Sequence, residues 1–373
     1  MEIVLSNNET YVLYLIIYIG SLLILWGADH IFSRQVSYLL YLIVSIVLGL
    51  IICCRDVGID RDTYLTIYQE TPLYLENYAA SSFQEPLYFL LNIIAYYVFN
   101  NYKFIQFFQG IIFAGASFEL LKFCRSKKIS TAICYSFYLA TIFFYLMGLN
   151  RMAIAVNCLT IGILKYFKNK RGFRFIITCV CASLFHYSAL IVSVLFIYLF
   201  VLKKNKQINY VILKIGCVLP VAGFIALKMA SAMLLSILPE KYKGYLTNIT
   251  FNISYLKNII YILPLFIIYI YFEANKILKR EDEKRVISKT MAIILFFTIF
   301  TMFFDGAFRF TFYFNFLIAF LYAFYLKKVR IFAYDCKVLI GIGYVIILLL
   351  YAVVVFFDSI YITNFIVPFR GTF

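Results

Sequence analysis

Residues 38–54 of the chain read YLLYLIVSIVLGLIICC, an apolar run that carries no charged side chain. A helix needs about 20 such residues to cross a hydrocarbon core of about 30 Å. Comparable runs occur at Tyr11–Trp26 and Val338–Phe357. Inside a bilayer only helices and closed barrels satisfy their backbone polar groups, and these runs are continuous rather than alternating. The pattern therefore predicts several membrane-spanning helices.

The composition extends this prediction to the whole chain. Of its 373 residues, 64% are hydrophobic and only 14% are charged, and the mean hydropathy is +0.91. A soluble domain carries about 25% charged residues. We expect an all-α, polytopic transmembrane helical bundle that forms a single domain over residues 1–373. Helix length predicts about 10–12 membrane helices or half-helices. The main external loops would be 55–84 and 228–257.

The basic residues that give the chain its net charge of +16 are unevenly distributed along the sequence. Basic residues gather in short clusters between apolar segments, which is how cytoplasmic loops are marked in membrane proteins. This distribution argues against binding of nucleic acid. The nine cysteines contain no Cys-x-x-Cys spacing and so indicate neither a zinc site nor a disulfide framework. The clusters assigned to the cytoplasm are Lys122–Lys128, Lys165–Arg174, Lys203–Lys206, Lys276–Lys289 and Lys327–Lys337.

Residues 175–202 do not fit a simple crossing. They lie between two basic clusters that both belong in the cytoplasm, so a single span would put one of them outside. The segment is also too short for two spans of about 20 residues each. It therefore predicts a re-entrant hairpin, or two short helices, with its tip near Phe185-His186-Tyr187-Ser188.

Residues 85–123 pose a similar problem, because they must make one net crossing if the loop before them is external. We expect 103–123 to cross and 85–100 to form a short dipping or surface helix that begins at Glu85-Pro86. Irregular backbone at membrane depth is tolerated where it is buried in protein or lines a wet cavity. Because both unusual segments carry ionisable residues, we expect them to line one cavity at the outer face.

Ionisable residues near the membrane are the candidates for function, because a charge at the bilayer centre costs about 2.5–3.5 kcal/mol. The string RDVGIDRDTY, from Arg55 to Tyr64, directly follows the apolar run at 38–54. In it, Asp60 would cap a helix that carries Tyr64 on the same face. An alternative is a divalent metal that Asp60 and Asp62 hold together with a diphosphate. Because capping explains Asp60 equally well, we expect no metal.

Three further candidates lie at predicted helix ends. Asn150-Arg151 opens a helix at the outer surface, His186 lies at the tip of the apolar hairpin, and Arg309 follows a tight turn at Asp305. Each also has a structural explanation: an arginine that reaches the interface, a buried core histidine and a local Asp305–Arg309 pair. Arginine suits a diphosphate because its planar group binds phosphate oxygens in pairs. Aromatic residues, 20% of the chain, suit membrane interfaces and the apolar faces of sugars.

At these residues the chain resembles the EpsG/Wzy-type polysaccharide polymerases. The family pattern Arg-x-x-Gly-x-Asp-x-x-x-Tyr is matched by the string from Arg55 to Tyr64. One position departs from the family: Met152 stands where a glutamine is usual, so the role of that glutamine does not transfer. The other matching elements, in chain order, are Glu85-Pro86, Asn150-Arg151, Phe185–Leu190, Arg309 and Pro368-Phe369.

The resemblance implies a glycosyltransferase of the GT-C type that uses no cofactor. Such an enzyme would polymerise undecaprenyl-diphosphate-linked oligosaccharide repeat units into O-antigen, capsule or exopolysaccharide at the outer face of the bacterial inner membrane. Membrane lipid, a flippase and a chain-length regulator would be its partners. The growing chain would leave its lipid diphosphate as a hydroxyl of the incoming unit attacks the anomeric carbon.

The resemblance also implies roles for individual residues. Arg151 and Arg309 would hold the diphosphate, with Arg55 in support. Either His186 or Asp60 would serve as the general base, because the attacking hydroxyl must lose a proton. The remaining substrate-binding residues would be Tyr64 and Glu85, which position sugar, together with Asn150, Asp305 and Tyr313.

Two other kinds of function use similar features. A lipid-linked-glycan flippase or another transporter also places ionisable residues in the membrane. Transporters commonly have duplicated halves, however, and the sequence shows no internal repeat. An O-antigen ligase or a membrane acyltransferase would be a related enzyme. An assay with lipid-linked repeat units separates the main alternatives: a ladder of products indicates a polymerase, one transfer a ligase, and no reaction a transporter.

Overall fold

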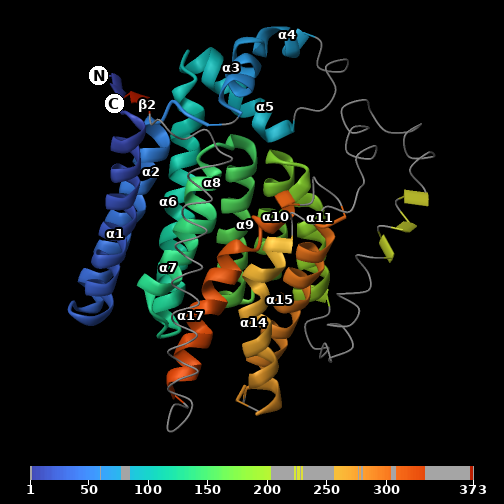
Figure 1. Ribbon diagram of the computed structural model, residues 1–373. Helices are drawn as coiled ribbons and strands as arrows, with labels where there is room; N and C mark the ends of the chain where they lie inside the picture. The colour runs from blue at the N-terminus through green and yellow to red at the C-terminus, as the bar shows by residue number, and fades with distance from the viewer. Residues whose placement is uncertain are drawn as a thin grey trace.

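The computed structural model is built almost entirely of helices in its described parts, which confirms the all-α prediction (Figure 1). Two three-residue strands are the exceptions among the described residues. The structure describes residues 2–58, 60–76, 85–202, 222–223, 225–226, 228–229, 256–275, 277–278, 280–303, 308–331 and 370–372.

Three helices of the described chain are long and apolar enough to cross a membrane. They contain the predicted spans 11–26, 38–54 and 103–123, and each extends a few residues beyond them. Many apolar side chains of the first two helices are exposed, as expected of a surface that faces lipid. The three helices are α1 (Asn7–His30), α2 (Arg34–Cys54) and α6 (Lys103–Ser126).

The two ends of the bundle can be named from these helices. The upper end in Figure 1 carries the last residue of α2, Cys54, and the start of α6. The lower end carries the turn between α1 and α2, with His30 and Arg34, and the last residues of α6.

Helices α2 and α6 pack against each other through glycine. A side chain on Gly49 would bring its Cβ within 2.7 Å of the carbonyl oxygen of Gly110, so neither position has room for one. Lower along the same contact, the hydroxyls of Ser45 and Ser117 lie 2.8 Å apart in the buried interface. Small residues of this kind let helix backbones approach closely. Such packing matters within a bilayer, because the hydrophobic effect contributes little to the association of helices there. The contact holds the upper end of α2 beside the start of α6.

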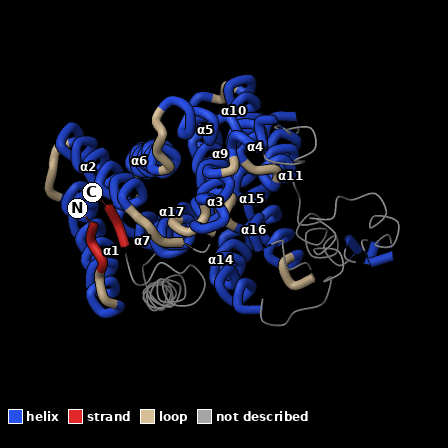
Figure 2. The backbone as a smooth tube through the Cα atoms, turned by 90° about the horizontal axis from the view of Figure 1, so that it is seen from above, coloured by secondary structure: helices blue, strands red, loops and turns tan. Residues whose placement is uncertain are grey.

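The next two segments form a tight antiparallel pair. One span rises as α7 (Thr131–Tyr138), η2 (Leu139–Phe143) and α8 (Phe144–Leu146), where η denotes a π-helical turn. After a short turn the chain returns as α9 (Asn150–Asn169), most of whose residues are buried. Figure 2 places α9 in the interior of the bundle, with α1 and α2 at one edge. The start of α9 therefore lies inside the upper end.

The predicted hairpin over 175–202 is present as two short helices, α10 (Gly172–Phe185) and α11 (Ser188–Phe196), and the second continues as η3 (Ile197–Leu202). The helical path is interrupted at His186, whose backbone is extended (φ −157°, ψ 119°). Helix α10 packs against α9 and α11.

The predicted short helix over 85–100 is also confirmed. It consists of α5 (Pro86–Ile93) and η1 (Ile94–Val98), and α5 packs against α10. Before it, two helices cover the upper end (Figure 1): α3 (Arg61–Gln69) and α4 (Thr71–Glu76).

Two helices of the C-terminal half do not coincide with the apolar runs at 290–304 and 310–326 of the sequence. The first begins before its run, because the charged residues that precede the run continue the same helical path. The second run is interrupted at 312–314, where Tyr313 and Phe314 donate to carbonyls only three residues back. The helices of this half are α14 (Leu256–Ala274), α15 (Glu281–Phe300), α16 (Phe308–Thr311) and α17 (Asn315–Ile331).

A short antiparallel pairing joins the two ends of the chain. Strand β1 (Glu2–Val4) pairs with β2 (Arg370–Thr372), with Ile3 opposite Gly371. Because β1 leads directly into α1, both termini lie at the upper end (Figure 1). The sequence did not predict these strands. The expected helix over 338–357, Asp305 and most of the expected loop 228–257 lie outside the described residues.

Candidate active site

A buried carboxylate, that of Glu85, joins three helices at the upper end. Its Oε2 accepts a hydrogen bond from Nη1 of Arg151 at 2.8 Å, and its Oε1 lies 2.9 Å from Nδ1 of His186. Glu85 precedes α5, Arg151 is in the first turn of α9, and His186 separates α10 from α11. Only 3% of Glu85 is exposed, so this acid is paired as a buried charge must be.

Local backbone features place these groups. Pro86 occupies the first turn of α5, where its fixed φ favours a helix start and its missing N–H costs nothing. Glu85 is therefore left in extended backbone at the helix entrance. The extended backbone of His186 likewise takes its side chain out of the helical path of the hairpin. The break that the sequence predicted in the hairpin is thus the feature that brings the histidine to the acid.

The guanidinium of Arg151 lies close to two tyrosine rings. Its central carbon is 5.5 Å from the ring centroid of Tyr64 and 5.8 Å from that of Tyr88, within the range of cation–π attraction. Its Nε is buried and has no hydrogen-bond partner in the described structure. A buried donor without a partner needs a reason, and a ligand that binds there would supply one.

The pairing with Glu85 decides which ring nitrogen of His186 carries the proton. An ionised carboxylate only accepts hydrogen bonds, and the adjacent Arg151 favours the ionised form of Glu85. Nδ1 of the neutral ring must therefore be the donor at 2.9 Å, which leaves the lone pair on Nε2. This is the tautomer that a general base requires, with a carboxylate to orient the ring.

Arg309 and Tyr313 belong to the same cluster. The Tyr313 hydroxyl lies 2.9 Å from Oγ of Ser188, at the start of α11. The positive charge of Arg309 acts on both His186 and Tyr313. The late arginine that the sequence singled out therefore lies close to the hairpin, and its helix α16 packs against α11. Asp305, which was expected beside it, lies outside the described residues.

Arg55 lies behind this cluster rather than in it. Only 1% of the residue is exposed, and its Nη2 donates to Oδ1 of Asn150 at 2.7 Å and to Oε1 of Gln109 at 2.9 Å. Asn150 in turn donates to the hydroxyl of Tyr102 at 2.8 Å. These bonds join the ends of α2, α6 and α9 next to Arg151. The structure thus places Arg55 and Asn150 in a buried network that positions α9.

Comparison with known protein families gives one match. The model of the EpsG family matches residues 38–370, which include every residue of the cluster described above. This chain belongs to the EpsG family. Membership supports a membrane protein of the polysaccharide-polymerase type. No curated protein and no solved structure shows a significant match to the chain.

The loop after α2 shows why this EpsG-family chain has glycine at position 58. The backbone φ of Gly58 is +139°, and a Cβ there would lie 2.9 Å from the Cα of Gly148. Any other residue would be strained and would also meet the turn before α9. The loop can pass close to that turn because Gly58 lacks a side chain.

In the described part of the chain, Asp60 and Asp62 of the same loop do not share a partner. Asp60 occupies the N-cap position of α3, as predicted, but makes no capping bond and instead accepts from the Tyr64 hydroxyl at 3.5 Å. The side chain of Asp62 is 94% exposed and binds Arg61 at 3.1 Å. The two acids of the pair therefore have different partners.

Several residues of the upper end were not singled out from the sequence. Gln109 and Tyr102 bind the Arg55 network, and Tyr88 lies against Arg151. Lys103 forms an ion pair with Asp56 at 3.0 Å and donates to the carbonyl of Arg55 at 2.9 Å. A signal existed for Gln109, because a glutamine within the otherwise apolar run of α6 needs a polar partner. The tyrosines gave none, because the chain has 33 of them.

Proposed function

We propose that this EpsG-family protein is a GT-C-like glycosyltransferase that polymerises undecaprenyl-diphosphate-linked oligosaccharide repeat units at the outer face of a bacterial inner membrane. The observation that carries the proposal is the Glu85 carboxylate, which holds Arg151 and His186 side by side in one buried cluster. A base and a cation in adjacent positions are the two groups that transfer from a diphosphate requires.

The reaction moves a growing glycan from its lipid diphosphate to a hydroxyl of the incoming unit. The hydroxyl oxygen attacks the anomeric carbon, and the bond from that carbon to the diphosphate oxygen breaks with its electron pair leaving on the diphosphate. The hydroxyl proton passes to Nε2 of His186, whose Nδ1–H is held by Glu85. The carboxylate then stabilises the imidazolium, as in other acid–histidine pairs.

The leaving diphosphate gains negative charge, so fixed cations close to it lower the barrier. Arg151 is held in place by Glu85 and by two tyrosine rings, and so loses little freedom when a ligand binds. Because Glu85 offsets one positive charge, a single arginine would leave the site close to neutral. Arg309, whose charge acts on His186, supplies the second cation. Both guanidinium groups can bind phosphate oxygens in pairs.

Reconstitution tests this proposal directly. The purified protein in proteoliposomes, supplied with a lipid-linked repeat unit from a polysaccharide-producing bacterium, should yield a ladder of products, and His186→Ala should abolish it. A single transferred unit would identify a ligase instead. Movement of the intact lipid-linked unit across the bilayer without new glycosidic bonds would identify a transporter.

A further inference from the structure

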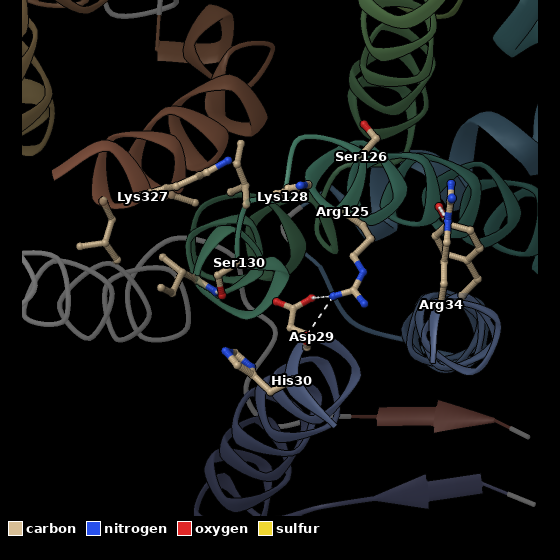
Figure 3. Close-up of a pocket in the computed structure, with 13 residues that line it drawn as sticks. Asp29, His30, Arg34, Arg125, Ser126, Lys128, Ser130 and Lys327 are labelled. Carbon is tan, nitrogen blue, oxygen red and sulfur yellow. Dashed lines mark hydrogen bonds and ion pairs between the residues drawn. The ribbon is translucent and has the colours of Figure 1, made fainter. Parts of the chain in front are cut away.

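A second polar site lies at the lower end of the bundle, away from the Glu85 cluster. A pocket of about 750 Å³ opens there between the end of α1, the start of α2, the turn from α6 to α7, and α17. Figure 3 shows Lys128 and Lys327 on one side of it and Arg34 on the other, with Arg125 between them.

The pocket holds more positive than negative charge. Four cationic side chains line it, those of Arg34, Arg125, Lys128 and Lys327, and the lining contains one carboxylate, that of Asp29. A lone acid with four cations leaves a net positive charge even with His30 neutral. Such a surplus in a concave site attracts anions.

The carboxylate of Asp29 already has several hydrogen-bond partners within the protein. The carboxylate of Asp29 accepts from the Tyr41 hydroxyl at 2.9 Å, from the backbone N–H of Thr131 at 2.6 Å and from the Thr131 hydroxyl at 3.0 Å. It also lies 3.7 Å from Nη1 of Arg125. Asp29 therefore holds the start of α7 and pairs with Arg125, and its single negative charge cannot offset four cations.

The lysines repel each other across the pocket. The charges of Lys328 and Lys128 both act on Lys327, and Glu283, which lies 3.4 Å from Lys328, offsets part of the effect. Lys327 is oriented by a bond from its Nζ to the carbonyl of Lys127 at 2.9 Å. Basic residues that only mark a cytoplasmic loop need not lie close together. Here, cations from four parts of the chain line one pocket. An anion in the pocket would relieve that repulsion.

The surroundings of the pocket favour a lipid over a free ion. Ile31 and Phe32 lie in the chain between the lining residues His30 and Arg34, and 65% and 46% of their surfaces are exposed. Trp26, 52% exposed, stacks on His30 at 5.1 Å. An apolar surface thus borders the cationic pocket at a membrane boundary, where tryptophan is common. A phospholipid would therefore place its acyl chains on the apolar surface and its charged headgroup in the pocket.

From these features we propose that the lower pocket binds the phosphate headgroup of an anionic phospholipid, with Lys128, Lys327 and Arg34 as its cationic contacts and the exposed face of α1 as the surface for its acyl chains. Basic pockets between membrane helices are suited to anionic headgroups in this way. The site is separate from the Glu85 cluster, and the proposal does not depend on the polymerase activity.

Lipid-dependent thermal stability tests the proposal, because a ligand that binds only the native state raises Tm by an amount that grows with the ratio of its concentration to its Kd. Full-length protein in a neutral detergent is titrated with phosphatidylglycerol, with phosphatidylcholine, and with inorganic phosphate, and no glycan substrate is present. We expect a rise in Tm that grows with the concentration of phosphatidylglycerol and a much smaller one with the other two. In the double variant Lys128→Gln/Lys327→Gln, the apparent affinity for phosphatidylglycerol should weaken roughly tenfold or more.

A matched control removes the same charge elsewhere at this end. Lys165→Gln/Lys168→Gln alters two exposed lysines of α9 that do not line the pocket, and it should titrate like the wild type. Equal titrations of the two double variants would overturn the proposal, as would equal effects of phosphatidylglycerol and phosphatidylcholine. A response to inorganic phosphate as strong as that to phosphatidylglycerol would overturn the lipid assignment and indicate a site for a free anion.

Discussion

At the residue scale, the contacts of Glu85 determine what the upper cluster can do. One carboxylate sets the tautomer of His186 and offsets the charge of Arg151. The sequence placed Glu85 among residues that position sugar, whereas its contacts suit it to hold the base and the cation. Of the two bases that the sequence left open, His186 has the orienting acid, and Asp60 contacts a tyrosine.

Replacement of that acid by its amide tests this assignment. Glu85→Gln keeps the shape but removes the charge that orients the histidine and pairs with the arginine. We expect the rate of polymerisation to fall about 10²–10³-fold while the protein remains abundant in the membrane. Glu119→Gln, which breaks the half-buried pair with Lys122 away from the cluster, is the matched control and should remain active. A normal product ladder from Glu85→Gln would refute the assignment.

The two arginines should not tolerate lysine. Lysine keeps the charge but lacks the planar group that binds two phosphate oxygens at once. We expect Arg151→Lys and Arg309→Lys each to lower the rate of chain elongation about 10²-fold or more, measured as product ladders at matched protein levels. The exposed Arg171 provides the control substitution, Arg171→Lys.

A local role for Arg309 predicts a different pattern. If Arg309 served only to pair with Asp305, Asp305→Ala should be as damaging as Arg309→Ala, and the double variant should be no worse than either. That pattern, or near-normal ladders from Arg309→Lys, would end the diphosphate assignment for this residue.

Chelation distinguishes the two interpretations of the acids in the loop after α2. Asp60 binds Tyr64, and Asp62 is exposed and bound to Arg61, so neither is arranged with the other around a common point. We expect polymerisation to continue after treatment with EDTA. Loss of activity that magnesium or manganese restores would make Asp60 and Asp62 metal ligands and would show that we are wrong.

At the scale of elements, the packing of α2 on α6 determines where the site lies. The glycine contact brings Arg55 to Gln109 and, through Asn150, to the start of α9. The same close approach is a weak point, because a larger residue at either glycine must move one helix away from the other. The cluster and the helix contact are therefore coupled.

A single methyl group tests the helix contact. Gly110→Ala would place its Cβ against the carbonyl of Gly49 and the sulfur of Cys53, and we expect it to destabilise the protein by about 1–3 kcal/mol. Gly20→Ala is the matched control, because nothing lies within 4 Å of its added Cβ, and it should be neutral or slightly stabilising. Thermal melting of the two variants in detergent measures the difference. Equal Tm values would mean that the helices separate at no cost.

At the scale of the whole molecule, the two ends of the bundle carry different chemistry. The upper end holds the Glu85 cluster and both chain termini, and the lower end holds the basic pocket and the basic turns. The distribution of basic residues predicts that the lower end faces the cytoplasm. The hairpin of α10 and α11 then returns to the side from which it started.

Labelling of single cysteines in a cysteine-depleted background tests this arrangement. A cysteine at position 62 should react with an impermeant reagent from outside the cell, and one at position 128 only after the cytoplasmic face is opened. Positions 171 and 204, on either side of the hairpin, should both behave like position 128. Labelling of 171 and 204 from opposite faces would rule out the hairpin, and labelling of 62 and 128 from the same face would rule out the orientation.

Much of the architecture followed from local patterns. Apolar runs located α1, α2 and α6, and the mismatch between span length and basic clusters predicted both the hairpin and the short helix at Glu85-Pro86. Local patterns did not predict the break at 312–314, because no proline or glycine marks it. The pairing of the two termini was equally hidden, because three-residue strands at opposite ends of a chain have no local signal.

The sequence by itself determined that this is a helical membrane protein and which ionisable residues lie in it, because the cost of polar groups in a bilayer leaves a direct record in composition and spacing. It could not assign partners to those residues. Only the tertiary structure decided that Glu85, Arg151 and His186 meet, that Arg55 faces inward to Gln109 and Asn150, and that four cations converge on one lower pocket. Such contacts join residues from distant helices, and helix packing alone sets their geometry.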